Sequence, residues 1–78
     1  MEHNVTIYST PTCHFCHMAK EFFKENSIVY TEKDVTQDQE ALKDMVEKTG
    51  QMGVPVIDID GKLIVGFDKH TVKELLGV

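Results

Sequence analysis

The chain has 78 residues, of which 41% are hydrophobic and 27% charged, and its formal net charge is −5. This length suits one small globular domain covering residues 1–78. A net acidic chain without a basic stripe disfavours nucleic-acid binding. The sequence has no apolar run near the roughly 20 residues that a membrane span needs, and no charged-then-apolar leader. We therefore expect a monomeric, cytoplasmic domain with no membrane or nucleic-acid partner.

The first two predicted elements are a strand and a helix. Residues 4–8 alternate in polarity, which predicts a strand, and the polar segment at 9–12 would end it. A helix is expected from Cys13 to residue 24 or 25, with Thr12 as its N-cap. The apolar positions that recur at helical spacing are Phe15, Met18, Ala19, Phe22 and Phe23.

A second strand and a second helix are predicted next. Thr36 opens the helix, with Gln39 three residues later completing a capping box, and Gly50 is a natural stop. The strand before it is short and weakly alternating. Its apolar positions are Ile28, Tyr30 and, as a further candidate, Val35.

The last third of the chain predicts a hairpin and a closing helix. Apolar runs at 54–59 and 62–65 flank Asp60-Gly61, which is a strong hairpin turn signal. Asp68 can cap a helix whose inward side chains would be Val72, Leu75 and Leu76. The element order β-α-β-α-β-β-α predicts an α/β fold: a four-stranded mixed sheet flanked by three helices, on both of its faces.

The sequence contains two cysteines, Cys13 and Cys16, at the start of the first predicted helix. The free N–H groups and the dipole at a helix N-terminus stabilise an anion, and the thiolate is the anion that attacks disulfides. The spacing of three places both sulfurs on one side of the helix, within reach of each other. We expect Cys13 to be the exposed nucleophile and Cys16, one turn deeper, to be the shielded resolving thiol.

Other chemistries of the cysteine pair are weighed against this interpretation. A structural disulfide is disfavoured because so short a loop removes little entropy from the unfolded chain. A zinc site needs about four ligands, and His14 and His17 are expected to point away from the two sulfurs. The segment from Cys13 to His17 also matches the C-x-x-C-H pattern of covalent haem attachment, which normally follows export. A redox sensor and a module that binds haem or a metal ion shared between two chains remain alternatives. We expect no metal and no bound prosthetic group.

The order and spacing of the motifs resemble the thioredoxin fold, and more specifically the glutaredoxin family, over essentially the whole chain. The resemblance implies a dithiol–disulfide oxidoreductase that uses glutathione as co-substrate. Its partners would be disulfide-containing or glutathionylated proteins. The segments that carry the resemblance are Val5–Ser9, Cys13–Cys16, Ala19-Lys20, Thr49–Gln51, Val54-Pro55, Asp60-Gly61 and Gly66–Asp68.

The resemblance also implies where a substrate would bind. Val54-Pro55 would contain a cis peptide bond facing the cysteines, and the Val54 backbone would pair with the incoming substrate like a strand. Thr12 and Phe15 would lie beside the bound substrate. The segment Gly66-Phe67-Asp68 would hold the γ-glutamyl carboxylate of glutathione on backbone N–H groups. For Asp68 the alternative is a helix cap alone, and for Gly66 a turn alone.

The chain departs from the family pattern at positions that bear on the reductant. Thr10 and Met52 stand where the family usually places basic residues near the glycine end of glutathione, which predicts weakened glutathione recognition. Gly66-Phe67 also resembles the glutaredoxin-like electron donors of ribonucleotide reductase, which take electrons from thioredoxin reductase. Glutathione and thioredoxin reductase therefore both stay open as electron sources.

Two further departures change side chains close to the cysteines. Val65 replaces one of the paired glycines that the family has before its last helix. His14-Phe15 replaces the usual Pro-Tyr between the two cysteines. A protonated His14 beside Cys13 would favour the thiolate and make the disulfide more oxidising. The alternative is an exposed histidine with no such role.

Overall fold

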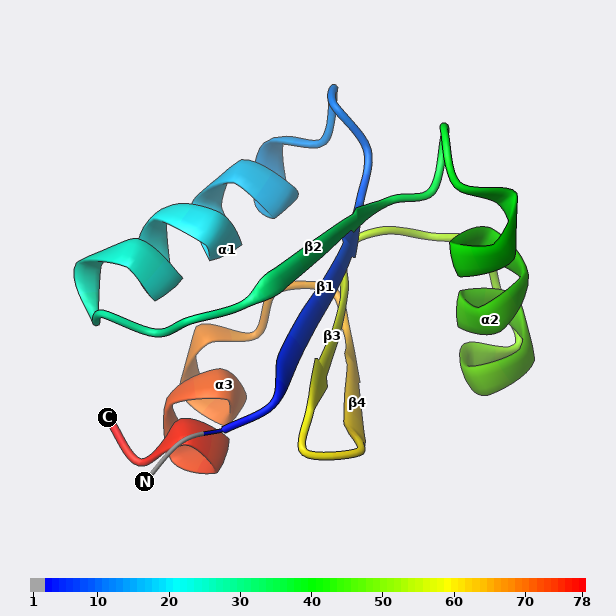
Figure 1. The fold of residues 1–78 in the computed structure, drawn as a ribbon. Helices are drawn as coiled ribbons and strands as arrows, with labels where there is room; N and C mark the ends of the chain where they lie inside the picture. Colours follow the sequence, from blue (N-terminus) through cyan, green and yellow to red (C-terminus); the bar gives the residue numbers. More distant parts are fainter. Residues whose placement is uncertain (1–2) are drawn as a thin grey trace.

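The computed structural model describes residues 3–78, which form a four-stranded sheet and three helices (Figure 1). The strands lie in the order β2-β1-β3-β4. β1 is parallel to β2 and antiparallel to β3, and β3 and β4 form an antiparallel hairpin. The predicted fold class and element order are confirmed. The bounds are β1 Val5–Ser9, α1 His14–Glu25, β2 Thr31–Asp34, α2 Gln39–Thr49, β3 Val56–Ile59, β4 Lys62–Val65 and α3 Lys69–Leu76.

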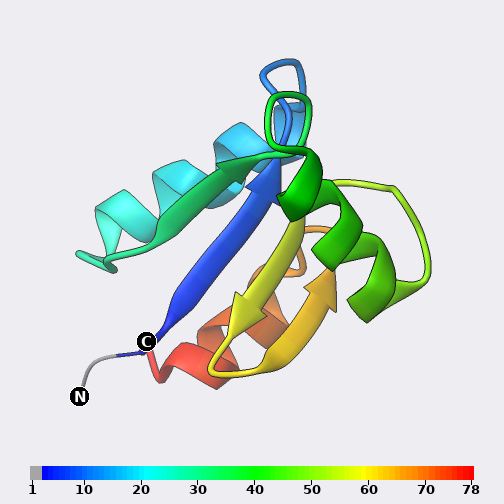
Figure 2. The same ribbon diagram turned by 45° about the vertical axis from the view of Figure 1, so that its right-hand side comes forward.

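The helices cover both faces of the sheet: α1 and α3 lie on one face and α2 on the other (Figures 1 and 2). Because side chains alternate along a strand, β1 sends Ile7 into the cluster under α1 and α3, and Tyr8 into the cluster under α2. The first cluster holds Val5, Ile7, Ala19, Phe22, Phe23, Ile57, Ile59, Ile64, Val72 and Leu76. The second holds Tyr8, Val35, Ala41, Met45 and Val56.

The second strand lies a few residues later than predicted. It covers Thr31–Asp34, whereas the apolar positions Ile28 and Tyr30 precede it and pack against the larger cluster. β2 lies at the edge of the sheet, pairs with β1 alone, and has no fully buried residue. Val35 is buried directly after the strand. Apolar residues therefore mark the core contacts beside this strand and not the strand itself.

Two predicted helix caps are wrong. The N-cap of α1 is Cys13, not Thr12, because the Cys13 sulfur accepts the hydrogen bond that a capping oxygen would usually accept. The N-cap of α2 is Asp38, whose side chain accepts a hydrogen bond from the backbone N–H of Ala41. Thr36 instead donates to Asp34 through both its backbone N–H and its hydroxyl, in the turn that follows β2.

The other predicted helix and turn signals are confirmed. Gly50 ends α2 with φ 73°, a left-handed conformation that costs glycine little. Asp68 caps α3. Asp60 and Gly61 form the β3–β4 turn with φ 53° and 91°, as a two-residue hairpin turn requires. No helix among residues 3–78 is long and apolar enough to cross a membrane.

Candidate functional site

Cys13 lies at the junction of the β1–α1 loop with the first turn of α1. Its backbone N–H donates to the carbonyl oxygen of Thr10 at 3.3 Å. Its Sγ accepts a hydrogen bond from the backbone N–H of Cys16 at 3.2 Å. The side chain is partly exposed to solvent. The sulfur therefore sits against the free amide end of a helix and can be reached from outside.

Cys16 differs from Cys13 in its access to solvent, because it is fully buried. Burial raises the pKa of the Cys16 thiol to about 12, with a hydrogen bond to Cys13 as the next contribution. The backbone of Thr10 and the charge of Lys20 act in the opposite direction. Cys16 therefore stays protonated at neutral pH until something stabilises its thiolate.

Val54-Pro55 lies directly before β3, at the end of the sheet where β1 leads into the cysteine loop. Its peptide bond is cis. Val56 pairs with Tyr8, so Pro55 lies next to the end of β1, the strand that leads into that loop. Pro55 is fully buried and Val54 is partly exposed. Among residues 3–78, no backbone hydrogen bond uses the N–H or the carbonyl oxygen of Val54.

The segment Gly66–Asp68 is tied to the same end of the sheet through Pro55. The Gly66 N–H donates to the carbonyl oxygen of Pro55 at 2.8 Å, so the N–H that we expected to be free for a ligand is already used. The Phe67 ring lies 5.9 Å from the Phe22 ring of α1. The Asp68 side chain accepts hydrogen bonds from the backbone N–H and the hydroxyl of Thr71. Both bonds hold the pKa of Asp68 below its usual value, and the bond from the Thr71 hydroxyl contributes most.

The remaining predicted site residues, Thr12, His14 and Phe15, lie on the surface at the start of α1. Thr12 is exposed. Phe15 is 56% exposed, which is high for so large an apolar side chain. The exposed His14 ring packs edge-on against Phe15, with ring centroids 5.7 Å apart. Met52, at a position where the family pattern has a basic residue, is also well exposed.

Two contacts near the cysteines were missed by the sequence analysis. His17 Nε2 lies 3.0 Å from the carbonyl oxygen of Pro11, which links α1 to the loop before Cys13. Lys20 forms an ion pair with Glu32, the two side chains meeting at 2.7 Å. The one-turn spacing from Cys16 to Lys20 was visible in the sequence. The partner Glu32 was not, because only the parallel pairing of β2 with β1 brings it beside α1.

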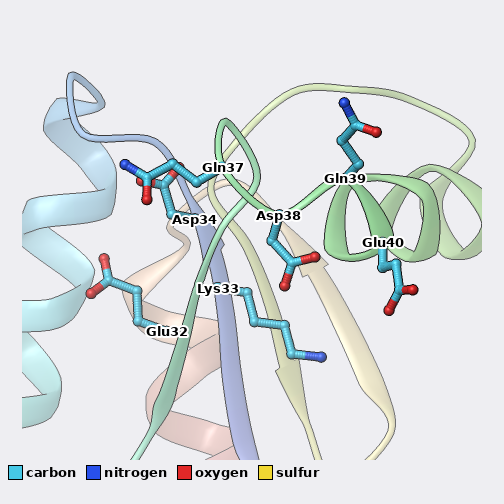
Figure 3. Close-up of a pocket in the computed structure, with 7 residues that line it drawn as sticks. All are labelled: Glu32, Lys33, Asp34, Gln37, Asp38, Gln39 and Glu40. Carbon is cyan, nitrogen blue, oxygen red and sulfur yellow. The ribbon is translucent and has the colours of Figure 1, made fainter.

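A separate, open depression of about 620 Å³ lies between β2 and the start of α2 (Figure 3). Neither cysteine lines it. Within residues 3–78 no cluster of histidine, cysteine or carboxylate side chains could hold a metal ion. The depression therefore does not enclose the cysteine pair. Its lining residues are Glu32, Lys33, Asp34, Gln37, Asp38, Gln39 and Glu40.

Comparisons with known proteins agree with this geometry. Residues 5–64 match the family model described as Glutaredoxin. The chain is 42% identical over 72 residues to an uncharacterized glutaredoxin-like 8.6 kDa protein in the rubredoxin operon of Clostridium pasteurianum, covering 92% of this chain and 96% of the relative. It is 32% identical over 65 residues to glutaredoxin 3 of Escherichia coli K12, covering 83% of this chain and 78% of that one.

A solved structure agrees over nearly the whole fold. The crystal structure of the thioredoxin-like protein BC3987 superposes with a TM-score of 0.87 at 30% identity. The match covers 92% of this chain and 99% of the other. The four-stranded sheet with its three helices is therefore a thioredoxin fold, as the sequence resemblance implies.

Proposed function

The chain belongs to the glutaredoxin family, and we propose that it reduces disulfides through a reversible Cys13–Cys16 disulfide. The observation that carries the proposal is the contrast between the two sulfurs. Cys13 is reachable from solvent and accepts a helix N-terminal N–H, whereas Cys16 is fully buried one turn further along. Such a pair suits a nucleophile and a resolving thiol.

The reaction proceeds in two exchanges. The Cys13 thiolate attacks one sulfur of a disulfide RS–SR′, forms the mixed disulfide Cys13–S–S–R and releases R′S⁻. The Cys16 thiolate then attacks Cys13 Sγ, which forms the Cys13–Cys16 disulfide and expels RS⁻. The substrate gains two electrons and the protein loses two. Protons from the two cysteine thiols balance the two released thiolates.

The surface around Cys13 suits an extended, partly apolar substrate segment. The Val54 backbone has a donor and an acceptor free of backbone partners within residues 3–78, so it can pair with a substrate strand. Phe15, two residues after Cys13, and Met52, two residues before Val54, add exposed apolar area, and Thr12 directly precedes Cys13. The proposed protein substrates are disulfide-containing or glutathionylated proteins.

Glutathione is the proposed co-substrate, held more weakly than is usual in the family. The N–H groups of Phe67 and Asp68 have no backbone acceptor among residues 3–78, so they are available to a carboxylate at the start of α3. The matching positions for the second carboxylate are Thr10 and Met52, and neither side chain is charged. A charge-assisted hydrogen bond is worth roughly 1.5–3 kcal/mol when well ordered, and less when exposed.

A thioredoxin-reductase-dependent electron donor is the second candidate. The same uncharged positions favour it, because a flavin reductase does not need the glutathione carboxylates to be bound. The cysteine chemistry is the same in both candidates, and only the source of electrons differs.

The test is NADPH consumption by the purified protein with insulin and a glutathione mixed disulfide as acceptors. One arm contains glutathione and glutathione reductase, and the other contains thioredoxin reductase alone. We expect turnover in at least one arm and none with Cys13→Ser. Turnover in the glutathione arm alone supports glutathione as the reductant, and turnover in the other arm alone supports the second candidate. No turnover in either arm contradicts the proposed function.

A further inference from the structure

Lys20 lies one helical turn after Cys16, on the same side of α1. Its side chain is only 18% exposed, unusually low for a lysine. Lys20 Nζ donates to Glu32 Oε2 at 2.7 Å, and the hydroxyl of Ser9 donates to the same oxygen at 2.9 Å. Ser9, at the end of β1, is itself buried. The ammonium group is therefore fixed by a short chain of hydrogen bonds beside the redox site.

The position of Glu32 comes from the alternation of β2. Its side chain extends toward α1, while that of its neighbour Lys33 extends toward α2 (Figure 3). Lys33 Nζ accordingly lies 5.7 Å from the centre of the Tyr8 ring, on the α2 face. The edge strand thus supplies a carboxylate to the helix that carries the cysteines.

The charge of Lys20 affects the pKa of Cys16. The hydrogen bond to Glu32 is the largest factor that keeps the pKa of Lys20 raised, so the ammonium stays charged at neutral pH. The same bond holds the pKa of Glu32 below its ordinary value. Burial raises the pKa of Cys16, and the positive charge of Lys20 acts in the opposite direction. The resolving step cannot start until Cys16 becomes a thiolate.

We propose that Lys20, anchored by Glu32, is a positioning residue that stabilises the Cys16 thiolate when Cys16 resolves the mixed disulfide. The proposal rests on the proposed function and deepens it. In this step the Cys16 thiol gives its proton to solvent, and the thiolate attacks Cys13 Sγ. The Cys13–Cys16 bond forms as the bond to the substrate sulfur breaks, and the departing RS⁻ takes up a proton.

The titratable groups around this site come from three segments. Cys13 lies on the same helical turn as the target thiol. Tyr30 acts on Lys20 from the segment before β2, and Asp34 acts on Glu32 from the same strand. A purely structural role, in which the Lys20–Glu32 pair only ties α1 to β2, is the competing explanation. That role would lower stability without shifting the pH dependence of resolution.

The test separates the two exchanges with one aromatic disulfide, 5,5′-dithiobis(2-nitrobenzoate), mixed rapidly with an equimolar amount of the reduced protein. Attack by Cys13 releases the first thionitrobenzoate, and resolution by Cys16 releases the second, so the absorbance rises in two phases. The variants are Lys20→Met and Lys20→Arg. Lys24→Met, which removes an exposed lysine one turn further along α1, is the matched control.

We expect Lys20→Met to slow the second phase by about tenfold at pH 7 and to move its pH midpoint up by about one unit. The first phase should change little. Lys20→Arg should restore the rate to within roughly twofold, and Lys24→Met should leave both phases unchanged. Urea denaturation of each variant checks that the compared proteins are folded, and Lys20→Gln replaces Lys20→Met if the latter is not.

The outcomes are distinguishable. An unchanged second phase in Lys20→Met overturns the inference, as does a slowed phase with an unmoved pH midpoint or no rescue by arginine. No first phase in the unsubstituted protein contradicts the proposed function itself. If the unsubstituted protein shows both phases and the Lys20 variants show the same rates, the proposed function stands and only the role of Lys20 is overturned.

Discussion

The two faces of the sheet are stabilised in different ways. Ten buried apolar residues pack between the sheet and α1 with α3, and Phe22 contacts both Phe23 and Phe67 there. The α2 face has five buried apolar residues, and a network of polar side chains packs beside them. In that network the Tyr8 hydroxyl donates to Asp44 at 2.7 Å, and Lys48 forms ion pairs with Asp44 at 3.2 Å and with Asp58 at 3.6 Å.

The difference explains where the chemistry lies. The larger apolar cluster fixes α1 through Ala19, Phe22 and Phe23, toward the middle and end of the helix. The first turn of α1 is then free to carry Cys13 at the surface without supplying much of the stability. On the α2 face the polar network begins at Tyr8 of β1, the strand that leads to the cysteines, but the Tyr8 hydroxyl binds Asp44 of α2. We therefore expect changes on the α2 face to lower stability while leaving the cysteine reaction unchanged.

The largest expected effect on activity is that of Cys13→Ser. A serine hydroxyl is not ionised near neutral pH and cannot form the mixed disulfide, so disulfide reduction should fall to background. Cys16→Ser should still form a mixed disulfide and stall there. Mass spectrometry after exposure to a glutathione disulfide measures the mixed disulfide in each variant. A glutathione adduct on Cys13→Ser would contradict the assigned order of attack.

The largest expected effect on stability is that of Phe23→Ala on the α1 face. Phe23 is fully buried, and such a truncation costs about 3–5 kcal/mol, compared with about 2–5 kcal/mol for Met45→Ala on the α2 face. Urea unfolding of both variants measures the difference. The reaction rate of Cys13 should stay unchanged in folded Met45→Ala. A larger loss in Met45→Ala than in Phe23→Ala would reverse our ranking of the two faces.

A smaller effect is expected from Tyr8→Phe. Burial, followed by the hydrogen bond to Asp44, raises the pKa of the Tyr8 hydroxyl, and the phenylalanine removes only that bond. We expect a loss of about 1 kcal/mol in the free energy of unfolding, with no change in disulfide reduction. A double-mutant cycle with Asp44→Ala isolates the pair. A loss of activity in Tyr8→Phe would show that the α2 face contributes to the reaction after all.

The smallest effect should come from the exposed turn at the hairpin end of the sheet. The hydrogen bond from His3, followed by that from the Asn4 N–H, holds the pKa of Asp60 below its ordinary value of 3.8. Because the folded value is the lower one, this stabilisation is present above the unfolded pKa. It is lost as the pH falls through the folded value, below about pH 4.

Asp60→Asn tests this dependence, since asparagine tolerates the left-handed backbone of the turn. The unfolding midpoint in urea should be lower than that of the unsubstituted protein at pH 7, and the gap should close toward pH 3. A gap that stays constant over this range would show that the carboxylate charge is not the cause. The disulfide reaction should be unaffected throughout.

Most of the fold was predictable because its signals are local. The cysteine pair, the Asp60-Gly61 turn, Gly50 and Asp68 each act through their own backbone or through neighbours a few residues away. The second strand was placed a few residues too early because none of its own residues is fully buried, and the apolar residues before it pack against the core. Cys13 was missed as the cap of α1 because sulfur is an unusual acceptor in that position.

By itself, the sequence determined the chemistry that is available and the order of the elements, since both depend on residue types and short spacings. It placed two thiols at a helix start and a charged residue one turn after the second thiol. The spacing also predicted that Cys16 would be the shielded thiol, and Cys16 is fully buried. Only the tertiary structure decided which contacts surround the pair. Only in the folded chain does the Gly66 N–H donate to the carbonyl oxygen of Pro55, and only there does Glu32 of the edge strand β2 pair with Lys20. These contacts join residues distant in the chain, and no local pattern encodes such a pairing.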